Sequence, residues 1–177
     1  FSVVSNIRLA STKDRMDEYY QYAGVAKTIG VDVNFLSPSQ VKEIWPLCNT
    51  DDLIGAIQHP EDGYIQPADL TQALATGARN KGANIYRNTN VVGIKESKEG
   101  WIVETDKGSI ECEHVVSCSG NFARQTGNMV GLDIPVIPVE HQYIVTEPHP
   151  EIQKRKKDGL PEMGVLRDSD SRWYMRE

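Results

Sequence analysis

The hydrophobic positions between residues 62 and 120 repeat with two different periods. Over Pro67–Lys81 the period is helical, Pro67 suits a first turn, and Gly82 suits a left-handed position after the last one. The apolar residues of that stretch are Leu70, Ala73, Leu74 and Ala78. Shorter, strand-like runs separated by turn residues follow at Asn84–Arg87, Val91–Ile94, Trp101–Thr105, Ser109–Cys112 and Val115–Cys118. The pattern predicts one helix followed by a small β-meander and further short strands.

Small residues replace the apolar ones at the end of this segment, at Ser119 and Gly120. The carboxyl end of a buried strand is where an α/β sheet admits ligands, and a glycine lets a ligand approach the backbone closely. Spacing alone therefore predicts an α/β segment with a candidate ligand position at Gly120. It does not identify the ligand.

The flanking residues predict further elements of both kinds. Before the segment we expect a strand from Val3 to Leu9, a helix over Lys13–Gly30 and a short helix that opens near Ser37 and stops at Pro46. After it we expect a short helix near Asn121, a strand over Val139–Glu147, a charged loop over 148–163, and a hairpin of Gly164–Arg167 with Arg172–Arg176. The sequence thus predicts a mixed α/β (α+β) chain.

Composition excludes several classes of protein. The 177 residues are 39% apolar and 25% charged, as in a soluble globular protein of one domain or parts of two. The net charge of −6 argues against a nucleic-acid partner, and no apolar run approaches the roughly 18 residues of a membrane span. Lys154–Lys157 is the one basic cluster; we interpret it as a solvated loop, with a phosphate or partner contact as the alternative.

The cysteines and the two ends of the chain give weaker information. There are three cysteines with no C-x-x-C pair, which favours a reducing compartment and predicts no metal site. The first residue is not Met, and the last residues form no terminating turn. We therefore expect the chain to be an internal part of a longer polypeptide.

The candidate binding and catalytic side chains lie in the last third of the chain. Strand alternation over Val139–Glu147 would put His141 and Tyr143 on one face, and alternation in the final strand would put Tyr174 beside Arg172 and Arg176. Such a wall suits a small anionic or amine-bearing molecule. The alternative is that His141 and Tyr143 are partly buried core residues with satisfied polar tips. No glycine-rich phosphate loop, nucleophile elbow or zinc-protease motif occurs in the chain.

Several segments, in order along the chain, match one family. They are Ile7–Thr12, Asp62–Pro67, Thr89–Ile94, Val115–Gly120, Pro138–Thr146, and Val165–Asp168 with Tyr174 after it. On these segments the chain resembles the middle of dimethylglycine and sarcosine dehydrogenases, FAD-dependent oxidoreductases of the D-amino-acid-oxidase-like superfamily. The Pro138–Thr146 segment is the most specific to that subfamily, and Ser5-Asn6 departs from its usual Gly-Ser.

The resemblance implies a two-domain flavoprotein. An FAD-binding Rossmann-like domain would be interrupted by a substrate domain built on an antiparallel sheet. Residues 1–60 and 134–177 would then be parts of the substrate domain, and residues 61–133 part of the FAD-binding domain. The N-terminal glycine-rich βαβ unit would lie outside this chain, so the isolated chain is expected to be inactive.

The resemblance also implies roles for single residues. The main chain at Val91 would meet the adenine end of FAD, and Ser119 and Gly120 would run beside the cofactor. His141 and Tyr174 would be catalytic residues that handle the substrate amine. From their chemistry rather than from a family motif, Tyr143, Arg167 and Arg176 are candidates for substrate binding, and the two arginines would bind a carboxylate. The alternative for each arginine is that it is an exposed partner in an ion pair.

The implied reaction is oxidation of an N-methyl group on a small amino acid, with a hydride passing to FAD. The amine must be neutral for that step, and a histidine, which ordinarily titrates near about 6.5, suits the removal of its proton. Tetrahydrofolate would bind to a C-terminal domain outside this chain, and the sequence does not identify the electron acceptor. The alternatives are an O₂-using glycine or sarcosine oxidase and a non-catalytic binding module. The expected location is the cytoplasm, or the mitochondrial matrix in a eukaryote.

Overall fold

The computed structural model describes residues 1–177, which divide into two compact units. The first unit combines Phe1–Leu74 with Thr146–Glu177, and the second is Ala75–Val145. Helix α3 (Pro67–Asn80) spans the division. The chain is a mixed α/β structure, as the sequence predicts.

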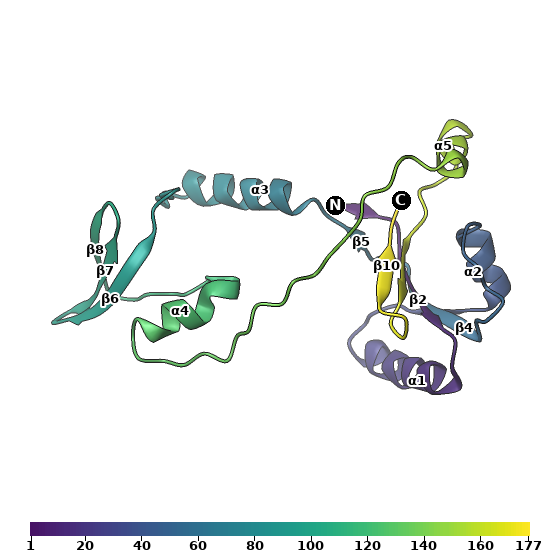
Figure 1. The fold of residues 1–177 in the computed structure, drawn as a ribbon, viewed down its shortest axis with the longest axis horizontal. Helices are drawn as coiled ribbons and strands as arrows, with labels where there is room; N and C mark the ends of the chain where they lie inside the picture. Colours follow the sequence, from purple (N-terminus) through teal and green to yellow (C-terminus); the bar gives the residue numbers. More distant parts are fainter. The chain divides into compact units, whose positions relative to one another are not determined.

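The first unit is built on a five-stranded sheet (Figure 1). Its strands lie in the order β10-β9-β2-β4-β3, and all neighbours are antiparallel except the parallel pair β2–β9. A separate ribbon pairs β1 (Ser2–Val3) with β5 (Gly63–Tyr64). The sheet strands are β2 (Asn6–Ala10), β3 (Asn34–Leu36), β4 (Gly55–His59), β9 (Val165–Asp168) and β10 (Trp173–Met175). The predicted hairpin near the end of the chain is thus confirmed.

Local caps explain where the first unit's early helices begin. In α1 (Lys13–Thr28) the Thr12 hydroxyl accepts from the Arg15 backbone N–H at 3.2 Å. In α2 (Pro38–Ile44) the Ser37 hydroxyl accepts from the Gln40 N–H, and the Gln40 side chain accepts from the Ser37 N–H, which makes a capping box. Both helices confirm predictions made from the sequence.

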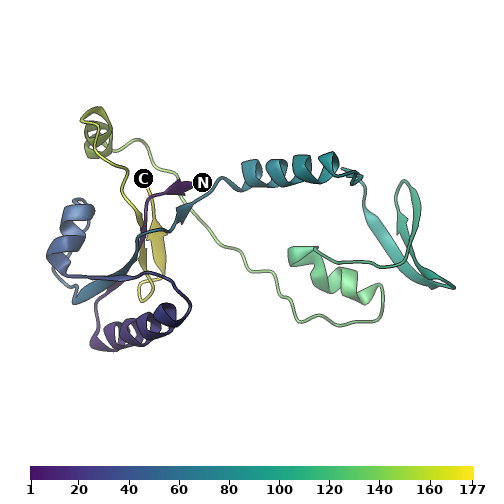
Figure 2. The same cartoon turned by 180° about the vertical axis from the view of Figure 1, so that it is seen from behind.

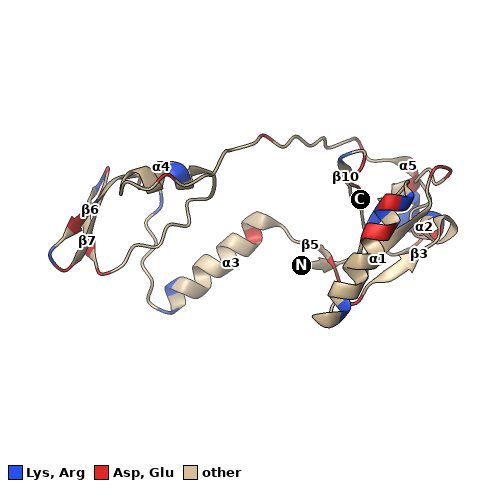
Figure 3. Ribbon diagram, turned by 90° about the horizontal axis from the view of Figure 1, so that it is seen from below, with Lys and Arg blue, Asp and Glu red and all other residues tan.

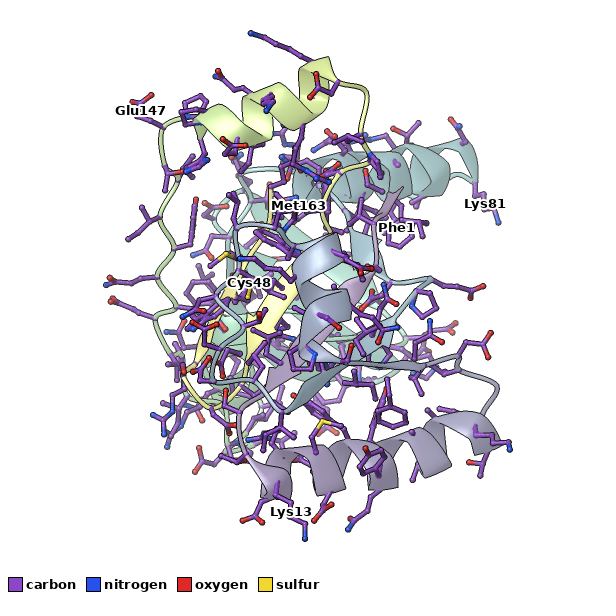
Figure 4. All side chains as sticks on the ribbon, turned by 90° about the vertical axis from the view of Figure 1, so that its right-hand side faces the viewer. Phe1, Lys13, Cys48, Lys81, Glu147 and Met163 are labelled. Atoms are coloured by element: carbon purple, nitrogen blue, oxygen red, sulfur yellow. The ribbon has the colours of Figure 1, made fainter.

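The core of the first unit lies on both faces of the sheet. On one face, side chains of β2, β4 and β9 pack with α2, and on the other, side chains of β2 and β4 pack with α1. Figures 1 and 2 show these two helices beside the sheet. Met163 and the partly buried Cys48, both labelled in Figure 4, belong to the first cluster. The buried residues of the first cluster are Ile7, Leu9, Val41, Trp45, Ala56, Met163 and Leu166, and those of the second are Ala10, Met16, Tyr19 and Ile57.

The second unit contains an antiparallel meander of β6 (Val91–Ser97), β7 (Gly100–Thr105) and β8 (Gly108–Cys112). A 3₁₀ turn, η1 (Gly120–Phe122), leads into α4 (Ala123–Asn128). The predicted meander strands and the short helix near Asn121 are confirmed. Helix α3 begins with an acidic first turn and ends with a basic last turn (Figure 3), which the helix dipole favours.

Three predicted strands are wrong. Asn84–Arg87, Val115–Cys118 and Val139–Glu147 form no strand. A strand becomes stable only with a hydrogen-bonded neighbour, and no other segment pairs with any of these three. An apolar run shows a tendency to extend, but it does not identify a partner.

The predicted charged loop over 148–163 is also wrong, because it contains α5 (Pro150–Lys157). Pro150 opens the helix, and the His149 side chain accepts from the Glu151 N–H at 3.3 Å. The basic residues of Lys154–Lys157 fall in the last turn, where the helix dipole favours positive charge. The interpretation of this cluster as a solvated loop is therefore corrected to a helix end.

Candidate functional site

Three side chains form a row across the first unit's sheet, and two of them, Arg167 and Tyr174, are candidates from the sequence. Arg8 in β2 lies opposite Arg167 in β9, and Arg167 lies opposite Tyr174 in β10. Residues paired across neighbouring strands share one face of a sheet. The Arg167 guanidinium carbon is 5.6 Å from the centre of the Tyr174 ring, so the structure brings these two predicted site residues together.

Arg176 contacts a different ring at the end of the same hairpin. Its guanidinium carbon lies 4.2 Å from the centre of the Tyr64 ring, and the Tyr64 hydroxyl donates to Glu162 at 2.8 Å. A guanidinium this close to an aromatic face is attracted to it. Arg176 therefore lies over a ring of β5, whereas Arg167 lies over the ring of Tyr174.

Acidic side chains fix the hairpin that carries Arg167 and Tyr174. Arg15 of α1 binds one carboxylate oxygen of Asp170 through two nitrogens, at 2.6 and 3.1 Å, and this hydrogen bonding lowers the pKa of Asp170. An oxygen of Asp168 accepts from the backbone N–H groups of Asp170 and Ser171. The hairpin turn is thus held against the start of α1, and both carboxylates are bound to other groups than Arg8 and Arg167.

His59 and Arg8 are neighbours that sequence reasoning did not select. The His59 Nε2 atom lies 3.0 Å from the Tyr22 hydroxyl. Burial lowers the pKa of His59, the positive charge of Arg8 lowers it further, and Asp62 acts in the opposite direction. The one available signal was the alternation Ile7-Arg8-Leu9, in which a cation interrupts two apolar residues. That pattern places Arg8 on the face opposite Ile7, but it cannot reveal Arg167 as its neighbour.

The candidate cofactor residues belong to the second unit. Val91 begins β6 opposite Thr105 and is half-buried, and the Ser119 hydroxyl lies 2.7 Å from that of Ser117. Gly120 has φ +53°, and a Cβ atom added there would meet nothing within 4 Å. No protein atom therefore blocks an approach to the backbone at Gly120, which is exposed.

His141 and Tyr143 lie in the irregular segment at the end of the second unit, and both are exposed. Because no strand forms there, the predicted common strand face for these two residues is wrong, and so is the alternative that buries them in a core. The other catalytic candidate, Tyr174, belongs to the first unit and is 47% exposed.

The structure holds neither a metal-binding cluster nor a membrane-spanning helix. No group of three or more His, Cys, Asp or Glu side chains is arranged to hold a metal ion. None of the helices has the length and apolar character needed to cross a membrane.

Comparison with known proteins shows the family. Residues 3–177 match the family of FAD dependent oxidoreductases, and the chain belongs to it. Rat (Rattus norvegicus) mitochondrial dimethylglycine dehydrogenase is 38% identical over 178 aligned residues, which cover 100% of this chain and 20% of the relative. Human mitochondrial sarcosine dehydrogenase is 35% identical over 95% of this chain and 18% of its own length. The mouse (Mus musculus) mitochondrial pyruvate dehydrogenase phosphatase regulatory subunit is 39% identical over 97% of this chain and 19% of its own length.

Solved structures agree with this membership. Glycine oxidase from Geobacillus kaustophilus is 33% identical with a TM-score of 0.68, over 77% of this chain and 37% of that one. L-proline dehydrogenase from P. horikoshii has a TM-score of 0.85 at 23% identity, over 99% of this chain and 46% of that one, and it shows the likeness of fold alone. The chain spans about a fifth of the length of the curated relatives described above.

Proposed function

We propose that this chain is part of an FAD-dependent oxidoreductase that oxidises the N-methyl group of a small amino acid, such as dimethylglycine or sarcosine. The observation that carries the proposal is the 38% identity to a dimethylglycine dehydrogenase along the whole chain. The Arg167–Tyr174 pair on an accessible sheet face supports it, because an amino acid offers a carboxylate to the guanidinium and an amine to the hydroxyl.

The cofactor would be held by residues of the second unit. Val91 would offer main-chain atoms, and Ser119 and Gly120 would line the approach to FAD, at the position where the structure leaves room. When bound, FAD supplies the acceptor for the hydride that leaves the N-methyl carbon. As the resemblance implies, the rest of the FAD-binding domain would come from outside this chain.

The proposal gives the remaining residues roles in handling the substrate. His141 takes up the proton of the substrate ammonium, so that the nitrogen lone pair can stabilise the positive charge left on the carbon. Tyr174 hydrogen-bonds the amine or a bridging water. Tyr143, Arg167 and Arg176 contribute to substrate binding, with the guanidinium groups toward the carboxylate.

A regulatory, non-catalytic role is the second candidate. The observation that favours it is the 39% identity to the regulatory subunit, which equals or exceeds the identity to the two dehydrogenases. The two candidates differ in a simple test, because a non-catalytic relative would bind its ligand without transferring electrons from an amine to FAD.

Variants of the catalytic candidates in the full-length protein test the proposed function. His141→Ala and Tyr174→Phe should each slow flavin reduction by an N-methyl amino acid on the order of 10²-fold, about 2.7 kcal/mol of barrier, while FAD binding is unchanged. His141→Gln removes basicity with less loss of shape. Tyr86→Phe is the matched control, because this tyrosine is 67% exposed and has no proposed role. Parent-like reduction by either catalytic variant between about pH 6 and pH 10 would return that residue to a structural role.

A further inference from the structure

We propose that Arg8, together with Arg167, forms the subsite that binds the carboxylate of the substrate. This inference rests on the proposed function for the identity of the ligand, and it adds a binding residue that neither the family match nor sequence reasoning assigns. Arg8 comes from the opposite end of the chain to Arg167, and only the sheet brings the two together.

Two cations lie side by side in this part of the sheet. Arg8 and Arg167 are directly paired in the parallel ladder of β2 and β9, so their stems leave the same face from neighbouring strands about 4.8 Å apart. Like charges placed directly opposite each other destabilise a sheet. An arrangement that persists despite this repulsion is suited to an anion bound between the two groups.

No carboxylate of the protein neutralises this pair. The ion pairs of the structure join Arg15, Lys95, Arg124 and Lys156 to acidic partners, and none includes Arg8 or Arg167. The two acidic residues nearest in the hairpin sequence, Asp168 and Asp170, are bound to backbone N–H groups and to Arg15. The carboxylate that would balance Arg8 and Arg167 must therefore come from a ligand or from a further part of the polypeptide.

Buried polar atoms without hydrogen-bond partners gather on the same face. Asn6 lies opposite His59, two residues along the strands from Arg8, so all three side chains share a face. Asn6 and His59 are each 8% exposed. Asn6 Oδ1, Arg8 Nε and His59 Nδ1 are all buried and make no hydrogen bond in this structure. Buried polar groups are normally satisfied, so these three mark a place prepared for polar partners. The Arg8 Nε–H is a donor and suits a carboxylate oxygen, whereas Asn6 Oδ1 is an acceptor and needs a donor.

The chemistry of the two guanidinium groups identifies the ligand class. A guanidinium binds a carboxylate through two parallel N–H···O bonds, and Arg8 has its Nε–H, one donor of that fork, unused. Tyr174 stands on the far side of Arg167 in the same row. A carboxylate held by Arg8 and Arg167 would place the amine of a short amino acid toward the tyrosine. The site therefore fits small α-amino acids and disfavours amines that lack an acid group.

The test compares two substrates and one inhibitor in the full-length, FAD-loaded protein. Arg8→Met removes the guanidinium at similar length, and Arg8→Lys keeps the charge but loses the fork. Lys13→Gln is the matched control, since it removes one positive charge from the exposed start of α1, at a residue with no proposed role. The substrates are N,N-dimethylglycine and its neutral analogue N,N-dimethylglycinamide. The dissociation constant of acetate, measured by calorimetry, reports binding without turnover.

We expect Arg8→Met to raise the KM for dimethylglycine and the acetate dissociation constant by about 10- to 100-fold, with kcat nearly unchanged. The amide analogue should react with Arg8→Met as it does with the parent protein. Arg8→Lys should give values between those of the parent and Arg8→Met, and Lys13→Gln should match the parent. Equal losses for dimethylglycine and its amide, or unchanged acetate binding, would overturn the inference. If the parent protein oxidised neither amine but lost acetate binding on Arg8→Met, the proposed function would fail and the anion subsite would stand.

Discussion

Leu166→Ala tests the assignment of faces on which the whole site depends. Leu166 and Arg167 are adjacent in β9. The structure puts the leucine in the core under α2 and the exposed arginine on the opposite face, the one on which α1 packs against β2 and β4. If this alternation is right, truncating Leu166 should loosen the strand that carries the arginine without touching the candidate site directly.

The expected loss follows from complete burial. Leu166 is 0% exposed and packs in a cluster with Ile7, Trp45 and Met163. Removing its three outer carbons costs about 2.4 kcal/mol at about 0.8 kcal/mol for each carbon. The cavity raises the total toward 3–5 kcal/mol, because β9 is held between β2 and β10 and can close only part of the space.

Native-state hydrogen exchange of the full-length protein measures this loss locally. Peptides that cover β2 and β9 should exchange roughly 150- to 5,000-fold faster in the variant, while peptides of the β6–β8 meander should not change. Arg167→Ala is the matched control on the neighbouring residue. It removes an exposed ring contact and should accelerate exchange only severalfold, about 0.5–1 kcal/mol. Similar effects of the two substitutions would refute the face assignment.

Three further predictions concern single features of the chain. Because burial and Arg8 lower the pKa of His59, the contribution of this residue to the free energy of unfolding should be fully present above the unfolded pKa, about 6.5, and be lost as the pH falls from there through the lower folded pKa. His59→Gln should therefore flatten the pH dependence of the free energy of unfolding below about pH 7, and an unchanged slope would contradict this. Gly63→Ala should destabilise the protein by about 1–3 kcal/mol in urea unfolding, since the new Cβ would lie 1.9 Å from the Ser2 carbonyl oxygen, whereas the control Gly24→Ala in α1 meets nothing and should be neutral or stabilising. The isolated 177-residue chain should bind FAD weakly or not at all, because the implied phosphate-binding loop lies outside it; stoichiometric yellow flavin in the purified chain would show otherwise.

Local signals predicted the parts of the fold that depend on neighbours in sequence. Capping residues at Thr12 and Ser37 specify where two helices begin, and the turn residues around Gly100 and Gly108 specify the meander. The runs at Val115–Cys118 and Val139–Glu147 have the composition of strands, but a strand also needs a partner, which composition does not provide.

The candidate site was predictable only in part for a related reason. The hairpin pairs Arg167 with Tyr174 across a short turn. The turn-forming residues between the two strands predicted this hairpin. Arg8 joins them through a parallel ladder between segments at opposite ends of the chain, and no local pattern encodes that register. His141 and Tyr143 were placed on a strand that does not form. The proposed role of His141 therefore rests on the family resemblance, and that of Tyr143 on its chemistry alone.

Anaerobic stopped-flow reduction of the full-length protein tests the central claim most directly. The protein would be mixed with dimethylglycine, sarcosine or unmethylated glycine in the absence of oxygen, and the flavin absorbance followed. The account predicts rapid, saturable bleaching with at least one N-methyl amino acid and much slower bleaching with glycine. A flavin-loaded protein that no N-methyl amino acid reduces would contradict it and would favour the regulatory role suggested by the likeness to the phosphatase regulatory subunit.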